Sequence, residues 1–359
     1  MTRSDKRIIV PFFISHQGCP HSCIFCDQRR ISGIDGSLPS VEEVSGKVRA
    51  YRKSSRQATV EVAFYGGTFT MLPLTEQKRL LASLQPLLDS GDISAIRLST
   101  RPDAITSSVT DLLLKYRVSL VELGVQSMDD RVLAAAGRGH SSSDTRQAFR
   151  LLTDAGIAVG AQLMPGLPGD SPEGSIRSLY EVLALKPKSL RVYPAVVVAG
   201  TELAHLFQSG EYFPLSLPAA VALGARHLHA ALRAGVPVIR MGLQATDLLS
   251  GPDGILAGPW HPAFRQLVES ELCCNLLCLL TSGKTGSATV AVHPSRISDV
   301  TGQHGTVRHR LQRQGITLNK VVADPMLTLH DLAVILDGTI LRGNIMTDLI
   351  FPDMVAYHA

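Results

Sequence analysis

The stretch R-I-I-V-P-F-F-I-S-H-Q-G-C-P-H-S-C-I-F-C, residues 7–26, decides how this chain is organised. Its first half is rich in Ile, Val and Phe and predicts a β-strand over Arg7–Ile14. Its second half places Cys19, Cys23 and Cys26 close together, although the whole chain has only 6 cysteines. A strand that leads directly into such a loop predicts that the thiols lie at the carboxyl end of that strand.

Similar apolar runs recur along the chain and alternate with helical patterns. This alternation is typical of βα units that build a parallel sheet. The predicted strands are Arg7–Ile14, Val60–Gly67, Ala95–Thr100, Leu120–Ser127, Ala158–Gly166 and Ser189–Val198. Gly and Pro cluster where these strands end, as in Gly66-Gly67. In a barrel of parallel strands such ends form the mouth, where chemistry takes place.

Local signals place the helices between these strands. Ser40 and Glu43 form a capping-box pattern, a leucine-rich stretch opens at Thr75, and the helix that follows Ser143 ends at Gly156. After about residue 215 the βα rhythm fades, and a break rich in Gly, Ser and Thr precedes a small α/β-like tail. The pattern therefore predicts one large α/β domain with a smaller C-terminal extension.

The composition indicates a globular protein. The 359 residues are 45% hydrophobic and 18% charged, with a net charge of +4 that permits nucleic acid as a partner without requiring it. No apolar run reaches the roughly 18–20 residues needed to cross a bilayer. The first residues lack the apolar core and cleavage site of a signal peptide, so we expect a cytoplasmic protein without membrane association. In a reducing compartment such as the cytoplasm, cysteines are more often free thiols or metal ligands than members of disulfides.

Three cysteines in one loop are an unusual number. Structural zinc sites need four ligands and disulfides need pairs, whereas three thiolates can hold three irons of a [4Fe–4S] cluster and leave the fourth iron open. Phe25 offers an apolar side chain beside the third thiol. Two alternatives stay open, namely a zinc site completed by His16 or His21, and thiols that are simply buried.

The loop C-P-H-S-C-I-F-C resembles the cluster motif of the radical S-adenosylmethionine (SAM) enzymes. Further stretches are similar to the radical domain of the Elongator catalytic subunit and to its short bacterial relatives. These stretches are F-Y-G-G-T-F-T (64–70), S-T-R-P-D-A-I (99–105), V-E-L-G-V-Q-S (121–127), R-G-H (138–140), L-M-P-G-L-P-G (163–169) and R-V-Y-P-A-V-V-V-A-G-T-E-L (191–203).

The resemblance implies an α/β enzyme with a partial (βα)6 TIM-like barrel as the radical SAM core over residues 1–245. Residues 246–359 are then a small α/β extension of unknown role, in which we find no acetyltransferase pattern. The resemblance also implies a [4Fe–4S] cluster on Cys19, Cys23 and Cys26, whose open iron is chelated by the methionine end of SAM. One electron from the reduced cluster then cleaves SAM to a radical that abstracts hydrogen from a substrate.

The same resemblance implies which residues contact SAM. Gly66 and Gly67 let the backbone approach the methionine ammonium group. Polar side chains for the carboxylate and the ribose come from strand ends, and we expect Thr68, Thr100, Arg101 and Gln126 in these roles, with Phe25 stacking beside the cluster. Many radical enzymes carry a carboxylate where this chain has Thr68, and relatives tend to carry Glu at Ser99, so no carboxylate is carried over. No catalytic residue is assigned.

The substrate is not named by these motifs. By analogy alone, transfer RNA is the first candidate substrate, and an electron donor such as flavodoxin or ferredoxin is the expected protein partner. One alternative is a porphyrin or another small molecule, as in the oxygen-independent coproporphyrinogen oxidases. Another is a binding protein on the same fold, such as a haem-delivery protein.

Several groups are left outside this interpretation. Cys273, Cys274 and Cys278 lie in an apolar stretch that predicts burial in a helix, with a second cluster as the alternative. Arg138 and His140 either bind substrate phosphate or cap a helix. A basic stretch predicts a solvated helix face, with RNA binding as the alternative. It comprises Arg296, His304, Arg308, His309, Arg310 and Arg313.

Overall fold

The computed structural model describes residues 7–20, 23–33, 37–54, 57–244, 246–251 and 254–351. The chain divides into two compact units. Unit 1 comprises residues 1–214 and 244–258, and unit 2 comprises residues 215–243 and 259–359. Each unit is therefore built from two separate stretches of chain. These units differ from the predicted domains, whose boundary at residue 245 marks the end of the radical SAM core. That boundary stays a prediction.

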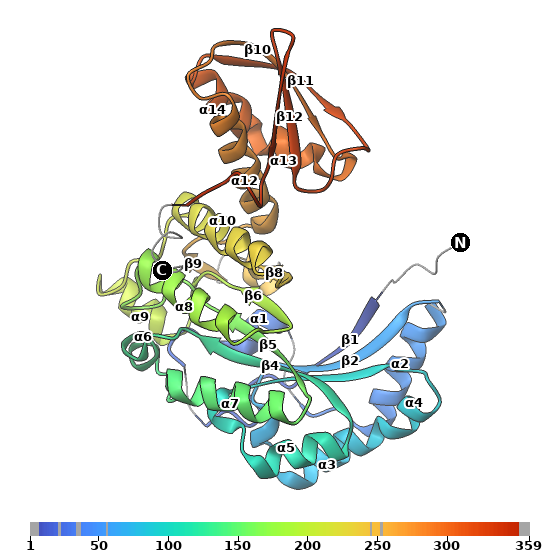
Figure 1. The fold of residues 1–359 in the computed structure, drawn as a ribbon. Helices are drawn as coiled ribbons and strands as arrows, with labels where there is room; N and C mark the ends of the chain where they lie inside the picture. Colours follow the sequence, from blue (N-terminus) through green and yellow to red (C-terminus); the bar gives the residue numbers. More distant parts are fainter. Residues whose placement is uncertain are drawn as a thin grey trace. The chain divides into compact units, whose positions relative to one another are not determined.

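A curved parallel sheet is the centre of unit 1 (Figure 1). Its strands are β1 (Arg7–Phe13), β2 (Thr59–Tyr65), β3 (Ala95–Thr100), β4 (Val118–Gln126), β5 (Ala158–Leu163) and β6 (Ser189–Val192). Each of these strands is parallel to the next. The hydrogen-bonded order of the whole sheet is β1-β2-β3-β4-β5-β6-β8, and its last strand, β8 (Val238–Met241), falls in the residue range of unit 2. The α/β partial-barrel fold predicted from the sequence is confirmed.

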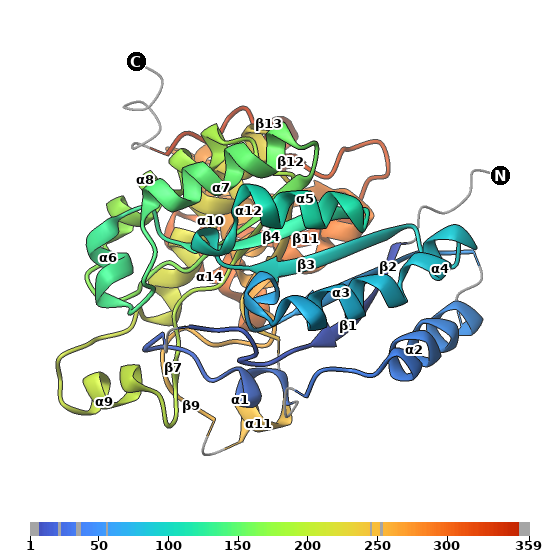
Figure 2. The same ribbon diagram turned by 90° about the horizontal axis from the view of Figure 1, so that it is seen from below.

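Helices cover the outer face of this sheet (Figure 2). They are α2 (Val41–Ser54), α3 (Leu74–Ser83), α4 (Gln85–Asp89), α5 (Ser107–Lys115), α6 (Asp130–Ala135), α7 (Ser142–Asp154) and α8 (Pro172–Ala184). The Nζ atom of Lys47 on α2 lies 4.8 Å from the centre of the Phe12 ring, and Phe12 contacts Phe64. Side chains alternate along a strand, so one face of the sheet packs under the helices and the other faces the barrel interior.

The predicted capping box at Ser40 and the predicted helix end at Gly156 are confirmed, whereas the leucine-rich stretch that opens at Thr75 forms two helices, α3 from Leu74 and α4 from Gln85. Ser40 Oγ accepts from the Glu43 N–H at 3.1 Å, and Glu43 Oε2 accepts from the Ser40 N–H at 2.7 Å. These two bonds satisfy donors that a helix start leaves without partners. Helix α7 ends at Asp154, and Gly156 follows in the left-handed conformation with φ 76°.

The predicted strand Ser189–Val198 is wrong as one element. It is split into β6 and β7 (Val197–Val198), and β7 pairs with β9 (Ile255–Ala257) in a separate two-stranded sheet. Pro194 lies between the two parts and has no N–H to donate to a sheet. The predicted six strands also omit β8, which is only four residues long.

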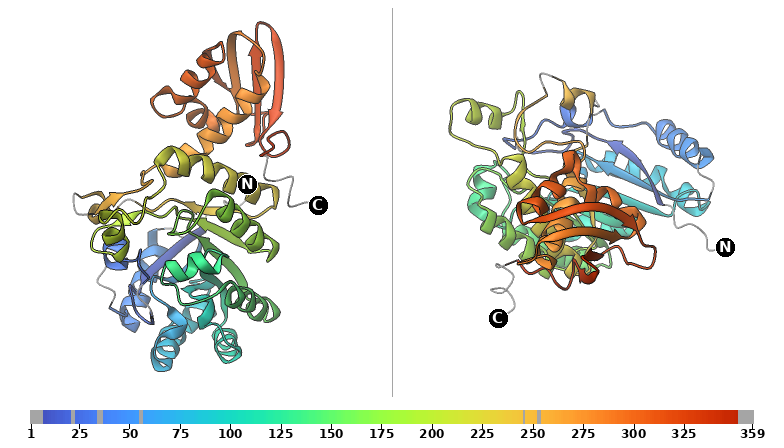
Figure 3. Two further views of the ribbon diagram at one scale, coloured as in Figure 1. Left: turned by 90° about the vertical axis from the view of Figure 1, so that its left-hand side faces the viewer. Right: turned by 90° about the horizontal axis from the view of Figure 1, so that it is seen from above.

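Unit 2 contains the long helices α10 (Leu217–Arg233) and α12 (Phe264–Leu280) and a four-stranded sheet. The sheet has the order β11-β10-β12-β13, made by β10 (Gly286–Val292), β11 (Ile316–Ala323), β12 (Asp331–Leu336) and β13 (Thr339–Asn344). Helices α12, α13 (Ile297–Thr301) and α14 (Thr306–Arg313) pack against these strands (Figure 3). The α/β character predicted for the C-terminal extension is confirmed.

Candidate functional site

The cysteine loop follows β1 directly and runs to α1 (Gln28–Ser32). It turns back on itself, because the Cys19 N–H donates to the His16 carbonyl and the Cys26 N–H donates to the Cys23 carbonyl at 3.0 Å. All three thiols are free, and each is partly buried. The loop therefore presents three unpaired sulfurs at the carboxyl end of the first strand, as the sequence predicts.

These thiols have the chemistry that an iron–sulfur cluster needs. Burial raises the pKa of Cys26 to about 12, and burial also raises the pKa of Cys19. An ordinary thiol in such a place stays protonated, whereas a bound metal ion deprotonates it. Three soft sulfur donors without a disulfide between them fit a cluster that is held by thiolates.

In the alternative of a zinc site, His16 or His21 would be the fourth ligand beside the three cysteines. The Nε2 atom of His16 accepts a hydrogen bond from the Gln28 N–H at 2.9 Å, and His21 lies outside the described residues. Within the described ranges, no group of three or more His, Cys, Asp or Glu side chains is placed to hold a single metal ion.

Gly66 and Gly67 form the turn after β2, and both have positive φ, 71° and 60°. A Cβ atom on Gly67 would lie 2.3 Å from the carbonyl oxygen of Gln17 and 2.5 Å from that of Ile14. Only glycine fits there, because the turn packs directly against the backbone of the cysteine loop.

The side chain of Gln28 joins the two loops. Its Oε1 accepts from the N–H groups of His16 and Gly67, both at 2.6 Å. No sequence motif predicts a role for this residue. Its only signal is its position two residues after the third cysteine, and its partner in the glycine turn is 39 residues away.

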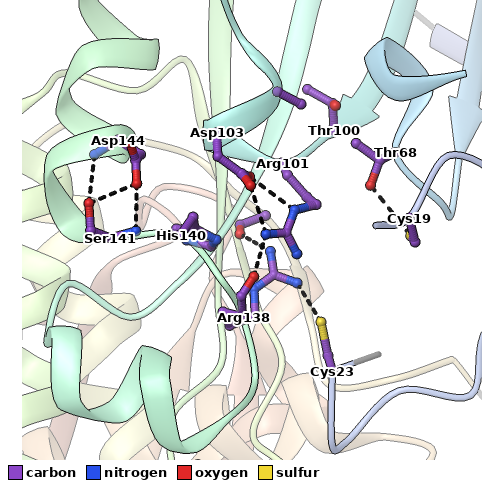
Figure 4. A network of polar contacts seen from close by, with 12 residues as sticks. Cys19, Cys23, Thr68, Thr100, Arg101, Asp103, Arg138, His140, Ser141 and Asp144 are labelled. Atoms are coloured by element: carbon purple, nitrogen blue, oxygen red, sulfur yellow. Dashed lines mark hydrogen bonds and ion pairs between the residues drawn. The ribbon is translucent and has the colours of Figure 1, made fainter. Parts of the chain in front are cut away.

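Thr68 contacts the cysteine loop, whereas Arg101 and Thr100 bond to residues on other segments. Thr68 Oγ1 lies 3.4 Å from Cys19 Sγ (Figure 4). Arg101 pairs with Asp103 through two bonds of 2.9 Å and also donates to the Arg138 carbonyl. Thr100 Oγ1 is bonded to Thr70 Oγ1 at 2.6 Å, so its hydroxyl already has a partner. The roles of these residues toward SAM stay predictions.

Gln126 ends β4 with a positive φ of 69°, which is rare for a residue with a side chain. The register between β4 and β5 shifts just before it. Its Oε1 accepts from Gln162 Nε2 at 3.2 Å. Strained backbone of this kind concentrates at functional sites. The predicted contact of Gln126 with SAM stays a prediction.

Phe25 packs in an apolar cluster and is 8% exposed. The cluster also contains Val132 and Leu167, and the thiols Cys23 and Cys26 pack against it. Phe25 therefore helps to exclude water beside two of the three sulfurs. Its predicted stacking on the cofactor stays a prediction.

Arg138 and His140 lie on the loop between α6 and α7 and are both 6% exposed. Arg138 Nη1 donates to Cys23 Sγ at 3.2 Å (Figure 4). Burial lowers the pKa of His140 to about 4, and the charge of Arg138 adds to this effect. His140 is therefore neutral near pH 7. Its Nε2 atom lies 3.2 Å from the Val125 carbonyl oxygen.

The interior face of the sheet carries a charged network that the sequence analysis missed. Glu122 on β4 accepts from Arg97 at 2.7 Å, from Tyr65 at 3.2 Å and from Arg191. Arg97 also pairs with Glu61 at 3.0 Å. Burial raises the pKa of Tyr65 to about 12. These residues alternate with apolar ones along their strands, as in V-E-V-A-F-Y, and this period of two could have revealed them.

The second group of cysteines lies on α12, as predicted. Cys273 and Cys274 are buried, and Cys278 is half-buried. Two members of the basic stretch are engaged in ion pairs: Arg296 contacts Glu269 and Asp299, and Arg310 contacts Glu271 at 2.8 Å. Arg308, His309 and Arg313 are exposed, and the His304 side chain lies outside the described residues.

Within the described part of the chain, no helix is both long and apolar enough to cross a membrane.

The fold and the loop define an α/β partial-barrel protein with three free thiols in the loop after its first strand. The profile of the radical SAM superfamily matches residues 13–178, and the profile of the radical SAM C-terminal domain matches residues 187–273. The chain belongs to the radical SAM superfamily.

The chain is similar in sequence to two curated relatives. It is 26% identical over 246 residues to the tRNA uridine(34) acetyltransferase of Methanocaldococcus jannaschii, which covers 57% of this chain and 46% of that protein. It is 30% identical over 208 residues to Elongator complex protein 3 of Saccharomyces cerevisiae, covering 52% of this chain and 37% of that protein. The chain thus spans about half or less of the length of these relatives.

A solved structure shares the fold. Elp3 from the archaeon Methanocaldococcus infernus, with its N-terminal residues deleted, superposes with a TM-score of 0.57 at 24% identity. The superposition covers 75% of this chain and 63% of that one.

Proposed function

We propose that this chain holds a [4Fe–4S] cluster on Cys19, Cys23 and Cys26, cleaves SAM reductively and modifies a nucleoside of transfer RNA. The observation that carries the proposal is the loop itself. Three free thiols follow the carboxyl end of β1, and two of them, those of Cys19 and Cys23, contact Thr68 and Arg138. Membership of the radical SAM superfamily supports the chemistry, and the relatives support the substrate.

A [4Fe–4S] cluster held by Cys19, Cys23 and Cys26 would supply the one electron that the reductive cleavage of SAM needs. The residues of this chain bind and orient. The carbonyl groups of Gly66 and Gly67 are available to an ammonium group, because neither residue has a side chain in the way. Thr68, Arg101 and Gln126 lie around the same mouth with hydrogen-bonding side chains. Phe25 and its apolar neighbours exclude water from the sulfurs.

Transfer RNA is the substrate we favour, because the relatives that share the radical domain include proteins named tRNA uridine(34) acetyltransferase. The interior face of the sheet offers polar groups beside the mouth. Arg191 donates to Tyr193 Oη at 3.3 Å, and both side chains are half-buried. Such groups are suited to a polar base that enters the barrel. A flavodoxin or ferredoxin would supply the electron.

The cofactor part is tested by anaerobic reconstitution of the full chain with iron and sulfide. Wild type is expected to bind about four irons, to absorb as a cluster and to release 5′-deoxyadenosine after reduction. The triple variant Cys19→Ala/Cys23→Ala/Cys26→Ala should lose both the absorbance and the product. The matched control is Cys273→Ala/Cys274→Ala/Cys278→Ala, which should keep both. Formation of 5′-deoxyadenosine by the first variant would refute the proposal.

The substrate part needs a separate measurement. Reconstituted enzyme, SAM, dithionite and unmodified tRNA are incubated, and the nucleosides are then compared by mass spectrometry with those from the triple variant. We expect a new nucleoside only with the active enzyme. Binding of tRNA should weaken steeply with salt, because phosphate contacts release counterions. Unchanged nucleosides, together with rapid 5′-deoxyadenosine formation, would leave the radical chemistry in place and remove tRNA as the substrate.

A further inference from the structure

Arg138 is held rigidly beside the second thiol. Its Nη1 donates to Cys23 Sγ at 3.2 Å, and its Nη2 donates to the Gly124 carbonyl at 2.7 Å. Arg101 donates to the Arg138 carbonyl and so fixes the backbone as well. A Cβ atom on Gly124 would lie 3.2 Å from Nη2, so this close approach is compatible with glycine and is crowded for any larger residue. The guanidinium group therefore has one well-defined position (Figure 4).

Arg138 brings a buried positive charge to this site. Arg101 beside it pairs with Asp103, whereas Arg138 makes no ion pair among the described residues. Its side chain is 94% buried, since the residue is 6% exposed, and its Nε is buried without a partner. A buried cation without an anion is costly, and proteins normally supply a partner. In the described part of the chain, the Arg138 guanidinium thus faces the Cys23 sulfur without a carboxylate paired to it.

We propose that Arg138 is a positioning residue that stabilises the reduced form of the cluster. The inference rests on the proposed function, because the anion it invokes is the thiolate-bound cluster. Arg138 would donate to the Cys23 thiolate and offset negative charge. Hydrogen bonds to sulfur and nearby positive charge set the potential of iron–sulfur clusters. The step concerned is the transfer of one electron from an external donor, with no bond formed or broken in the protein and no proton taken up.

The test measures the midpoint potential of the reconstituted cluster, by titration with dithionite followed by electron paramagnetic resonance. Arg138→Gln should make the cluster at least tenfold less reduced at a fixed potential, which corresponds to a shift of about 59 mV to more negative values for one electron. Arg138→Lys keeps the charge and should recover part of the shift. Arg131→Gln is the matched control, because Arg131 is exposed and pairs with Asp129, and it should leave the potential unchanged.

Two outcomes overturn the inference. Arg138→Gln with full iron content and the wild-type potential would show that the guanidinium does not act on the cluster. If Arg138→Gln fails to fold, Gly124→Ala provides the second test, because its new methyl group would lie 3.0 Å from Gln126 Nε2 and 3.2 Å from Arg138 Nη2 and so crowds both side chains. Gln126→Ala, measured beside it, separates the effect of Gln126 from that of Arg138. A wild-type potential in Gly124→Ala, or a shift that Gln126→Ala reproduces, would then refute the proposal, and a shift in the same direction that Gln126→Ala does not show would support it.

The failure of the proposed function has a different signature. If wild type itself assembles no cluster, both proposals fall together. If wild type assembles the cluster and makes 5′-deoxyadenosine while the potential does not depend on Arg138, only the positioning role is wrong.

Discussion

Gly67 shows how a single residue connects two loops of the site. Its φ of 60° lies in the left-handed region, and its Cβ position is occupied by the carbonyl oxygens of Gln17 and Ile14. The turn after β2 can therefore lie against the cysteine loop only if this residue has no side chain. Any substitution there adds a clash with backbone to the cost of the conformation.

We predict that Gly67→Ala lowers the free energy of unfolding by about 3 kcal/mol. Alanine is strained in the left-handed conformation, and its methyl group overpacks the contact with the cysteine loop. Gly91→Ala is the matched control. Gly91 has a similar φ of 74° but nothing within 4 Å of its Cβ position, so its loss should be about 1 kcal/mol. Denaturant unfolding of the two variants measures both values. Equal losses would mean that the contact with the cysteine loop has no energetic weight.

Cys278 gives a prediction on reactivity. A hydrogen bond from the Cys274 thiol lowers the pKa of Cys278 to about 7, and the charge of Arg310 acts in the same direction. Only the thiolate is nucleophilic, so alkylation of Cys278 by iodoacetamide should be half-maximal near pH 7. Cys274→Ala should move the profile to higher pH. Peptide mass spectrometry follows the reaction, with Cys273 as an internal control because burial raises its pKa to about 12. An unmoved profile in the variant would contradict the role of Cys274.

Site residues can be predicted from the sequence where their spacing along the chain is itself the motif. The three cysteines and the glycine pair are recognisable because their meaning lies in their spacing. Gln28 and Arg138 are different, since their contacts with Gly67 and Cys23 span 39 and 115 residues. No local pattern encodes such contacts, and only the folded chain brings these groups together.

Strands of the barrel are joined by the ion network on the interior face. Glu122 on β4 connects Arg97 on β3 with Arg191 on β6. We predict that Glu122→Gln lowers the free energy of unfolding by about 3–5 kcal/mol, because it removes the carboxylate that pairs with Arg191 and leaves Arg97 with Glu61 alone. Glu181→Gln is the matched control. Glu181 and its partner Arg146 are about half exposed, so that change should cost about 0–1 kcal/mol. Similar unfolding curves for both variants would rule out a structural role for the network.

Helix α10 carries a buried histidine that makes stability depend on pH. Burial lowers the pKa of His227 to about 4 from its ordinary value of 6.5. Between these values the unfolded chain binds more protons than the folded chain, so stability falls as the pH is lowered from 6.5 toward 4. The free energy of unfolding is lower by about 3 kcal/mol once the pH is below both pKa values.

We predict that His227→Gln flattens this decline, because glutamine does not take up a proton. Urea unfolding at several pH values between 7 and 4.5 measures the slope. His205→Gln on α9 (Glu202–Gln208), where the imidazole is exposed, should keep the wild-type slope. If the His227→Gln curve runs parallel to that of wild type, His227 is not the group responsible.

Helices and strands can be predicted from the sequence where they have a long apolar run or clear capping residues. β3 has the predicted limits, and the Ser40–Glu43 capping box is present. The predictions failed at short strands. β7 and β8 have two and four residues, too few to show a period, and their pairing partners decide that they are strands at all.

At the scale of the whole molecule, the order of the parallel strands follows from the βα rhythm, because consecutive units normally lie side by side. The interleaved division of the chain does not follow from it. Residues 215–243 belong with residues 259–359, and residues 244–258 belong with the first 214. Composition changes little at these points, so the contacts between distant segments, such as β7 with β9 and α10 with α12, could not be read from the sequence.

The interleaving predicts how a truncated chain behaves. A fragment of residues 1–245 lacks β9, the partner of β7, and lacks α12, which packs against α10. On α10, the Gly224 position lies close to Val268 and Phe264 of α12, so the fragment would expose the apolar surface that these side chains cover. Exposed apolar surface of this kind favours aggregation.

We therefore predict that residues 1–245 alone aggregate in size-exclusion chromatography and show no cooperative thermal transition by circular dichroism. The matched control is residues 1–351, which keep every described helix and strand and should unfold cooperatively. A monomeric 1–245 fragment with a sharp transition would contradict the interleaved division and would place the end of the radical core at residue 245. Because both fragments contain the cysteine loop, iron binding by each would show whether the site needs the second unit to form.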